Sequence, residues 1–393
     1  MPEPSLGLIM ILRDEAANLP RSLAPVAGCF DEVVVVDTGS QDDTPRICEG
    51  LGASVFHRPW DHDFAAARNH AIERARAGWL LWLDGDNAVT PAEVRALRRV
   101  LPAKGPAIIW GQELVTPGGQ RLWQKRCFPR RPDVRFQGRV HEQLQHPPGW
   151  PNLAAPMTIL HWGYMDPRRV LAKGEYYLAL LEQSLEDAPG DYYLNYQAGR
   201  CLWNLGRVEA AAARLERAAA AEAARRDNPE LWAAAQHLLA QALARLGRAS
   251  AAEETLDRLL EVMPRHGLSH YQRGRLAYDL GDWAGAVDHL SLALELGLAA
   301  PVVDLDPVRT LFFARYFLAR ALERLGRAQD ALPVLAAAVA GEPSHLAART
   351  DLARLLIHCG RSREARPHLD QVLAARPGDR RANQLLDHLR GAV

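Results

Sequence analysis

The chain has 393 residues, a hydrophobic content of 48% and a formal net charge of zero, with 47 basic and 47 acidic side chains. This length predicts two or three domains with real cores, and the balanced charge argues against a nucleic-acid-binding protein, which should carry a basic patch. The five cysteines form no C-x-x-C pair, which argues against a disulfide framework or a zinc site and favours reduced thiols.

Two targeting features are missing from the sequence. The N-terminus has no signal-peptide pattern, and no window approaches the ~20 apolar residues of a membrane-spanning helix. We therefore expect a cytoplasmic protein without a transmembrane segment, either soluble or peripheral at the inner face of the membrane.

The first half alternates strand and helix patterns. Strands separated by helices of about ten residues indicate right-handed βαβ units and a parallel sheet. The predicted strands are 6–12, 32–36, 53–57 and 80–83, and the predicted helices are 16–27, 44–51 and 64–77, with Gly78 ending the last one.

The pattern becomes irregular after Pro91. Two further strands are predicted, with Gly118-Gly119 as the hairpin turn between them, and a last short strand ends near His161. The segments are strands at 107–115 and 122–128, an Arg- and His-rich stretch at 129–146, a loop at 147–156 and the final strand at 158–162.

Two acids one residue apart follow the apolar run at 80–83. Asp84 and Asp86 would lie at the carboxyl end of that strand, where ligands bind in open α/β sheets. Side chains at i and i+2 share one face of an extended segment, so both carboxylates can reach one ligand. Paired oxygen ligands suit a divalent metal beside phosphates, so this stretch predicts an active site.

The second half reads as helical from about residue 166, and its pattern repeats. Turn glycines recur at intervals of 41, 34, 45 and 34 residues, each with a small residue seven before, an alanine five after and a leucine nine after. Small residues let two antiparallel helices approach, and leucine fills the gap between them. This pattern resembles the tetratricopeptide repeat, whose period is 34 residues. The aligned positions are Gly206, Gly247, Gly281, Gly326 and Gly360; Gly199, Ala240, Gly274, Ala319 and Ala353; Ala211, Ala252, Ala286, Ala331 and Ala365; Leu215, Leu256, Leu290, Leu335 and Leu369; and Pro264, Pro343 and Pro377, which end second helices. Insertions are predicted around 222–229 and 301–307.

Six motifs in the first half occur in the order of a known family. They read LRDEAANL at 12–19, DEVVVVDTGS at 31–40, DFAAARN at 63–69, WLDGD at 82–86, GRVHEQL at 138–144 and HWGY at 161–164. Together they resemble the family-two glycosyltransferases of GT-A fold, a subset of which carries C-terminal tetratricopeptide repeats, including some bacterial peptide S-glycosyltransferases. The resemblance implies an α/β GT-A domain with a Rossmann-like mixed sheet at 1–165, a linker helix at 166–187 and an all-α solenoid of about five repeats at 188–393.

The resemblance implies a donor site at the strand ends. Asp37 would contact the uracil or ribose of a nucleotide-sugar, and Arg68 of the A-R-N motif would face the donor phosphates, since a guanidinium binds phosphate oxygens in pairs. The competing interpretations are a turn acid for Asp37 and a surface ion pair with Asp61, Asp63 or Glu73 for Arg68. The remaining residues implied to line this cleft are Leu12, Arg13, Glu15 and Gly39, with a solvated side chain as the alternative for Arg13.

The metal site implied by the resemblance consists of Asp86, Asp84 and His161. Asp86 would bind Mn²⁺ or Mg²⁺ directly, Asp84 would lie nearer the ribose or sugar, and His161 would favour Mn²⁺ over Mg²⁺ or be structural. The sequence departs from the commoner family form here, because Gly85 replaces alanine and Asn87 replaces glutamate, which removes one negative charge.

The candidate base is Glu142, with His141 as the alternative. An inverting transfer needs a base that deprotonates the acceptor as it attacks the anomeric carbon. The competing interpretations are a Glu142–Arg139 ion pair and a loop-capping His141. Two further sets have both functional and structural interpretations: a basic cluster of Arg126, Arg130, Arg131, Arg135 and Arg139 that holds phosphates or forms a solvated rim, and a segment with Trp60, Asp61 and Asp63 that shapes the donor pocket or packs and caps.

The sequence thus predicts an inverting, metal-dependent glycosyltransferase that moves a sugar from a UDP-sugar to a peptide or protein engaged by the repeats. A lipid-linked or cell-envelope glycan is the second acceptor class, and a scaffold with a degenerate nucleotide site is the alternative from another class. A nucleotidyltransferase is less favoured, because Arg13-Asp14-Glu15 is not a glycine-rich phosphate loop. The repeats would present the acceptor or mediate a homodimer.

Overall fold

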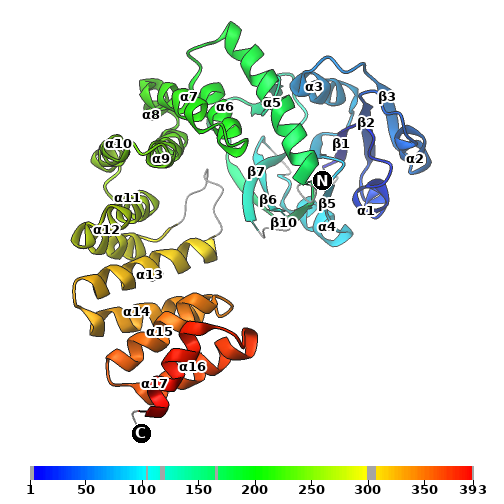
Figure 1. The fold of residues 1–393 in the computed structure, drawn as a ribbon. Helices are drawn as coiled ribbons and strands as arrows, with labels where there is room; N and C mark the ends of the chain where they lie inside the picture. The colour runs from blue at the N-terminus through cyan, green and yellow to red at the C-terminus, as the bar shows by residue number, and fades with distance from the viewer. Residues whose placement is uncertain (1–3, 103–104, 116–119, 164–166, 299–306, 392–393) are drawn as a thin grey trace. The chain divides into compact units, whose positions relative to one another are not determined.

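The computed structural model describes residues 4–102, 105–115, 120–163, 167–298 and 307–391 (Figure 1). The chain forms two compact units, Met1–Arg207 and Val208–Val393. The predicted Gly118-Gly119 turn and Tyr164 of the HWGY motif lie outside the described residues. Within them, no helix combines the length and the apolar character needed to cross a membrane.

A mixed eight-stranded sheet forms the centre of the N-terminal unit. Its strands are β1 (Leu6–Leu12), β2 (Glu32–Asp37), β3 (Ser54–His57), β4 (Trp79–Leu83), β5 (Asn87–Ala88), β6 (Ile108–Val115), β7 (Gln120–Pro129) and β10 (Asn152–His161), in the order β3-β2-β1-β4-β7-β6-β10-β5. Strands β1 to β4 run parallel, as the alternating pattern predicted. Strand β7 runs antiparallel to β4 and β6, which makes the sheet mixed.

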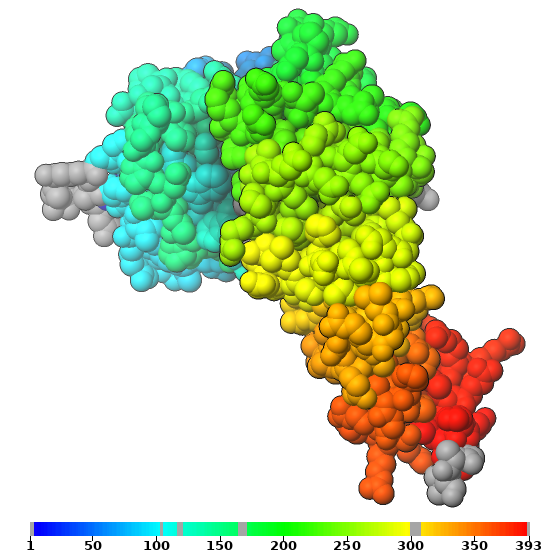
Figure 2. Space-filling view, turned by 90° about the vertical axis from the view of Figure 1, so that its left-hand side faces the viewer, coloured from blue at the N-terminus to red at the C-terminus, as the bar shows by residue number. Residues whose placement is uncertain are grey.

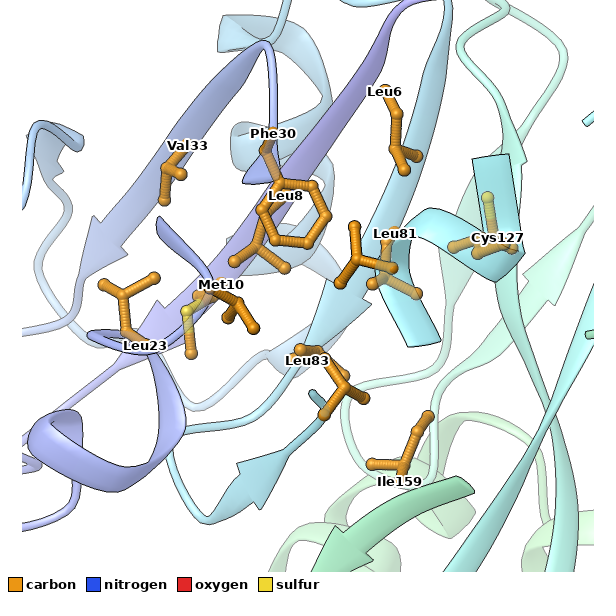
Figure 3. Packing of buried hydrophobic residues seen from close by; sticks show 14 of the residues in the cluster. Leu6, Leu8, Met10, Leu23, Phe30, Val33, Leu81, Leu83, Cys127 and Ile159 are labelled. Atoms are coloured by element: carbon orange, nitrogen blue, oxygen red, sulfur yellow. The ribbon is translucent and has the colours of Figure 1, made fainter. Parts of the chain in front are cut away.

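Both faces of β1, β2 and β4 are buried, which explains why these strands read as continuous apolar runs, whereas the edge strand β3 is partly exposed. Leu8 and Met10 of β1 lie on one face with Leu81 and Leu83 of β4, as Figure 3 shows. Ile9, between Leu8 and Met10, belongs to the cluster on the opposite face. Because successive strand side chains alternate between faces, one short sequence supplies both cores.

Two predicted helices of the first half are shorter than expected. In place of a helix at 16–27, the structure has α1 (Leu19–Ser22) and a 3₁₀ turn at Ala27–Cys29, because Pro25 cannot continue a helix. Helix α2 (Thr44–Gly50) lies where it was predicted. Helix α3 (Phe64–Arg74) ends before Gly78, because the Glu32 carboxylate accepts hydrogen bonds from the backbone N–H groups of Arg76 and Ala77 and turns the chain toward β4.

The region after Pro91 contains structure that the irregular pattern did not predict. Helix α4 (Pro91–Val100) begins with a capping box in which Thr90 and Glu93 bond each other's backbone N–H. The stretch 129–146 forms the hairpin β8 (Arg135–Gln137) and β9 (Gln143–Gln145). Strand β10 begins at Asn152 rather than 158, with an irregularity between Ala154 and Thr158 where it pairs with β6. The predicted loop at 147–156 is therefore wrong in its second half.

Helices follow from residue 167 onward, as predicted. In the N-terminal unit they are α5 (Pro167–Asp187) and α6 (Tyr192–Asn204). The C-terminal unit contains α7 (Val208–Ala220), α8 (Glu222–Asp227), α9 (Pro229–Arg245), α10 (Ala249–Val262), α11 (Gly267–Leu280), α12 (Trp283–Leu296), α13 (Pro307–Arg324), α14 (Ala328–Gly341), α15 (Leu346–His358), α16 (Ser362–Ala375) and α17 (Arg380–Gly391). The chain colours of this unit follow one another in order on its surface in Figure 2, as expected for helix pairs that contact their neighbours.

The aligned repeat positions do what the pattern predicted. All five turn glycines have positive φ, from 74° to 84°, a conformation that side chains with a Cβ rarely adopt. The five aligned alanines and five aligned leucines are at most 1% exposed. At Gly274 of α11, a Cβ would lie 2.8 Å from Cγ of Leu290 in α12, so the small residue permits the close approach. The insertion at 222–229 is confirmed and contains α8, whereas most of the insertion at 301–307 lies outside the described residues.

Candidate active site

The carboxyl ends of β1, β2 and β4 meet at one edge of the sheet. Leu12 pairs with Asp37 across β1 and β2, and Met10 pairs with Leu83 across β1 and β4. Because the three strands run parallel, the loops that follow them are neighbours. Glu15, Asp37 and Asp84 therefore come from separate motifs to one edge.

Arg68 joins two of the predicted acids. Its side chain is 6% exposed, its Nη2 donates to Oδ1 of Asp84 at 2.8 Å, and its Nε donates to Oε1 of Glu142 at 2.5 Å. Burial acts against the charge on Arg68, but the two carboxylates raise its pKa. The surface-ion-pair interpretation of Arg68 is therefore wrong, as is the pairing of Glu142 with Arg139.

The asparagine next to Arg68 fixes the hairpin that leads to Glu142. The Asn69 side chain donates to the carbonyl of Phe136 and accepts from the Phe136 backbone N–H, both at 2.9 Å. The backbone N–H of Phe64 donates to the carbonyl of Arg139 at 2.8 Å. Helix α3 is thus hydrogen-bonded to β8 and to the loop that follows it, which gives the A-R-N motif a structural role.

A second buried group surrounds Asp86 and His161. Nε2 of His161 lies 3.4 Å from Oδ2 of Asp86, and its Nδ1 is hydrogen-bonded to Glu113 of β6, which is 2% exposed. Burial disfavours the protonated ring, yet Asp86 and Glu113 raise the pKa of His161 to about 9. His161 is therefore oriented by a carboxylate behind it, as metal-binding imidazoles commonly are.

Arg126 of β7 connects the two groups. Its Nη2 donates to Glu113 at 2.9 Å, and its Nη1 lies 3.9 Å from Oδ2 of Asp84. The guanidinium carbon of Arg126 lies 3.8 Å from the centroid of the Trp82 ring, and that of Arg68 lies 4.0 Å from it. The Trp82 ring therefore makes a cation–π contact with each arginine. Burial opposes ionisation of Asp84, but Arg68 and Arg126 lower its pKa to about 2.

These contacts form one network of alternating charge, which we call the charge chain. It runs in the order Glu142, Arg68, Asp84, Arg126, Glu113, His161 and Asp86. Each carboxylate in it faces a cationic side chain, which is what allows this many ionisable groups to be buried together.

The departures from the commoner family form have local explanations. A Cβ at position 85 would lie 2.6 Å from Cδ and Cγ of Glu15, so glycine leaves room for that side chain. Asn87 is fully buried, accepts from the backbone N–H of Asp84 and donates to Oδ1 of Asp86, both at 3.3 Å. An acid at 87 would add a further buried negative charge beside Asp86. Gly163 also lies against Asp86, where a Cβ would overlap its Oδ2.

The other predicted donor residues occupy different environments. Asp37 accepts from the backbone N–H groups of Gly39 and Ser40 at 3.3 Å and lies 3.2 Å from Nδ1 of His57, so it stabilises the turn after β2. Leu12 packs in the core, where its side chain is buried. The Arg13 side chain is 53% exposed.

Glu15 and the segment before α3 complete the surroundings. Burial and the charges of Asp86 and Asp84 raise the pKa of Glu15. A hydrogen bond from Asn18 acts in the opposite direction but does not cancel the increase. Asp63 caps α3 by accepting from the Ala66 N–H, and Trp60 donates to the Tyr176 hydroxyl, so capping and packing explain this segment. Of the predicted basic cluster, Arg126 belongs to the charge chain, whereas Arg131 pairs with Asp133 and Arg135 bonds backbone carbonyls.

Two side chains of this site, Asp86 and His161, suit one divalent cation. Two ligand atoms bound to one metal at right angles, with bonds of about 2.1 Å, lie roughly 3 Å apart. The carboxylate of Asp86 and Nε2 of His161 are separated by about this distance. Asp84, predicted as a further ligand, has its oxygens toward Arg68 and Arg126 instead. In the part of the chain that the structure describes, no group of three or more His, Cys, Asp or Glu side chains is arranged around a cation position.

Three contributors to this site escaped sequence reasoning. Glu113 had no assigned role, Trp82 was only part of a motif, and Arg126 was one arginine among five. The signal was present for Glu113, because it interrupts the strand pattern of 107–115 with a charge on a buried face. Its partners come from β7 and β10, and that pairing could not be read from the sequence.

Comparisons with known proteins address the same two regions. A family model described as Glycosyl transferase family 2 matches residues 8–154. Two models described as Tetratricopeptide repeat match residues 237–301 and 322–389.

Two curated relatives each match about half of this chain. A TPR repeat-containing protein of Synechococcus elongatus is 37% identical over 218 residues, which are 52% of this chain and 54% of that protein. The SPbeta prophage-derived glycosyltransferase SunS of Bacillus subtilis is 26% identical over 217 residues, 53% of this chain and 51% of SunS. The chain thus spans about half the length of these relatives. Among solved structures, the TPR protein YrrB aligns with 53% of this chain and 97% of its own, with 17% identity and a TM-score of 0.42.

An α/β domain with acids at its strand ends, followed by paired helices, defines a two-part protein. The chain carries a family-two glycosyltransferase domain at its N-terminal end and tetratricopeptide repeats in its C-terminal half. The predicted family and fold class are therefore confirmed.

Proposed function

We propose that the N-terminal unit is an inverting glycosyltransferase that transfers a sugar from a UDP-sugar to a peptide or protein held by the repeats. The observation that carries this proposal is the pairing of buried Arg68 with both Asp84 and Glu142, next to Asp86 and His161 at the sheet edge. The family match and the likeness to SunS, which is named as a glycosyltransferase, support the same class of reaction.

In this proposal the nucleotide lies against the loops after β1 and β2. Asp37 and Gly39 face the uracil or ribose, and Arg13 and Glu15 border the same cleft. Asp84 lies nearest the ribose or sugar, where its bond to Arg68 keeps it ionised and oriented. Because both hydrogen bonds of Arg68 go to carboxylates, we assign it to holding these acids rather than to direct contact with the donor phosphates.

Glu142 acts as the base. It accepts the proton of the acceptor group while the acceptor atom forms a bond to the anomeric carbon. The bond from that carbon to the diphosphate oxygen breaks, and the nucleoside diphosphate leaves with the electron pair. Burial, with Arg200 and Lys173 nearby, lowers the pKa of His141 to about 3, which makes its ring a poor proton acceptor and favours Glu142 of the two candidates.

Asp86 and His161 are the residues that would hold a divalent cation. Such a cation neutralises the charge that develops on the diphosphate leaving group. His161, which is held protonated by Asp86 and Glu113, would release its Nε2 proton as the cation binds, and an imidazole ligand favours Mn²⁺ over Mg²⁺. Glu113 orients His161 by its hydrogen bond to Nδ1.

A screen of nucleotide-sugars tests the function. The full chain is incubated with UDP- and GDP-linked sugars and Mn²⁺, and released nucleoside diphosphate is measured. We expect slow hydrolysis of a UDP-sugar that stops when the cation is chelated. The Asp86→Asn variant should lose it, whereas Asp133→Asn, which changes an exposed acid, should not. Absence of turnover with every UDP-sugar would contradict the donor assignment.

Acceptor, assembly and location form the remaining part of the proposal. Mass spectrometry of material that copurifies with the chain, after reaction with a labelled donor, should show sugar on peptide; label on glycan or lipid would favour the second acceptor class. The repeats also offer a surface for a homodimer, which sedimentation would detect. A cytoplasmic location is supported by the cysteines, which are all free thiols.

A further inference from the structure

The loop at 138–143, which carries Glu142, has an unusual backbone. Gly138 has a φ of 100° and His141 has a φ of 52°. A residue other than glycine holds a positive φ only where its surroundings enforce that conformation. The position of the Glu142 carboxylate on Arg68 therefore depends on the groups that fix this loop.

A tyrosine of α6 provides two of the hydrogen bonds at this loop. The Tyr193 hydroxyl donates to the carbonyl of His141 at 3.1 Å and accepts from Nε2 of Gln143 at 2.6 Å. It thus bonds the residues on both sides of Glu142. Tyr177 of α5 adds an edge-to-face ring contact with His141, with ring centroids 5.6 Å apart.

The state of the Tyr193 hydroxyl suits this role. Burial, with a contribution from the Glu142 charge, raises the pKa of Tyr193 to about 12, so the hydroxyl keeps its proton at any physiological pH. Asp191 caps α6 by accepting from the backbone N–H of Leu194 at 2.9 Å, which fixes the first turn in which Tyr193 stands.

Helix α6 also belongs to the repeat pattern. It carries Gly199, the small residue of the first aligned repeat, and ends just before the turn glycine Gly206. Helix α6 nevertheless lies within the compact N-terminal unit, which extends to Arg207. The first helix of the repeat pattern is therefore packed with the transferase.

We propose that Tyr193 is a positioning residue of the transferase, whose hydroxyl fixes the loop at 138–143 so that the Glu142 carboxylate meets Arg68. This inference rests on the proposed function. It extends the catalytic unit beyond the predicted boundary at 165 to a helix of the first repeat. The N-terminal part of the repeat array then serves the active site.

The test is Tyr193→Phe in the full chain, which keeps the ring and removes both hydrogen bonds. The donor contacts lie on other loops, so we expect kcat to fall about tenfold while KM for the UDP-sugar stays within about twofold. Hydrogen–deuterium exchange should become faster in peptides covering 138–143 and stay unchanged in β1, β4 and the repeats.

Two further variants separate this role from general damage. Gln143→Ala removes the donor on the other side of the hydroxyl from an exposed position and should speed exchange at the same loop. Tyr176→Phe is the matched control, because its hydroxyl bonds Trp60 and His62 and not this loop. It should leave kcat and loop exchange at wild-type values.

The outcomes distinguish this inference from the function on which it rests. If the wild-type chain turns over no nucleotide-sugar, the proposed function is wrong and the exchange data alone decide the role of Tyr193. Unchanged loop exchange in Tyr193→Phe overturns the inference. So does a kcat equal to that of Tyr176→Phe, or a loss of activity accompanied by faster exchange throughout the molecule.

Discussion

The two units bury different kinds of side chain. The N-terminal unit buries Arg68, Glu113 and Arg126 beside its sheet edge, where Glu113 faces Arg126 and both arginines face Asp84. The C-terminal unit repeats small and aliphatic residues at its helix contacts, and its buried Asp351 accepts a hydrogen bond from Tyr316 and is neutralised by Arg320 and Arg381. The first pattern suits chemistry and the second suits a surface for binding.

This difference also determines what each unit tolerates. Removing one member of a buried charge network leaves its partner uncompensated, whereas a changed apolar contact costs only the local packing. Substitutions in the charge chain should therefore cost more than substitutions at the repeat contacts, and only the former should abolish activity.

The largest effect is expected for Glu142→Gln. The amide keeps the shape but cannot accept the proton, so kcat should fall roughly 10²- to 10⁴-fold. Initial rates at saturating donor measure this. Glu49→Gln, on an exposed part of α2, is the control and should behave as wild type. Nearly full activity in Glu142→Gln would remove Glu142 as the base.

The next effect is on stability, from Glu113→Gln. The change removes the nearer of the two acids that face Arg126, together with the charge that faces His161, and should lower the free energy of unfolding by about 3 kcal/mol. Denaturant titration monitored by tryptophan fluorescence measures it. Glu364→Gln removes an exposed partner of Arg361 and should produce no measurable change. Equal stability of the two variants would contradict the idea that the N-terminal unit depends on its buried charges.

A smaller effect is expected at a helix contact of the repeats. Gly274→Ala places a Cβ against Leu290 and His289, and should destabilise the α11–α12 pair by about 2 kcal/mol, as overpacked cores do. Thermal unfolding of the full chain is the measurement. Gly378→Ala, where a Cβ meets nothing within 4 Å, is the matched control. Donor hydrolysis should be unchanged in both variants.

The smallest effect is a pH dependence of the repeats. Burial, with His266 nearby, lowers the pKa of His237 to about 3, so the unfolded chain binds a proton there that the folded chain does not. Stability is therefore complete above the ordinary histidine pKa and is lost as pH falls toward 3. Between pH 7.5 and 5.5 the part of this loss that comes from His237 should be about 1.4 kcal/mol. His237→Gln should reduce the pH dependence by that amount; an unchanged slope would contradict the assignment.

The sequence predicted the parts of the molecule that depend on local pattern. Strands β1 to β4, the acids after β4 and the repeat glycines follow from periodicity and motifs. Helix α4 was also readable, because Thr90 and Glu93 have capping-box spacing, but the irregular surroundings concealed it.

What sequence reasoning missed depends on contacts between distant segments. Arg68 meets Glu142 across 74 positions, and His161 meets Glu113 across 48. Neither pairing has a local signature, so Arg68 was assigned to phosphates and Glu113 to nothing. Tyr193 was missed for the same reason, since its partners lie in a loop about 50 residues earlier.

Titration calorimetry of UDP tests the central claim most directly. The full chain and its Asp86→Ala variant are each titrated with UDP, with and without Mn²⁺. If Asp86 and His161 hold a cation beside the diphosphate, Mn²⁺ should tighten UDP binding at least about tenfold in the wild-type protein and leave the variant unaffected. UDP binding that ignores both the cation and the substitution, or no UDP binding at all, would contradict the account of this site.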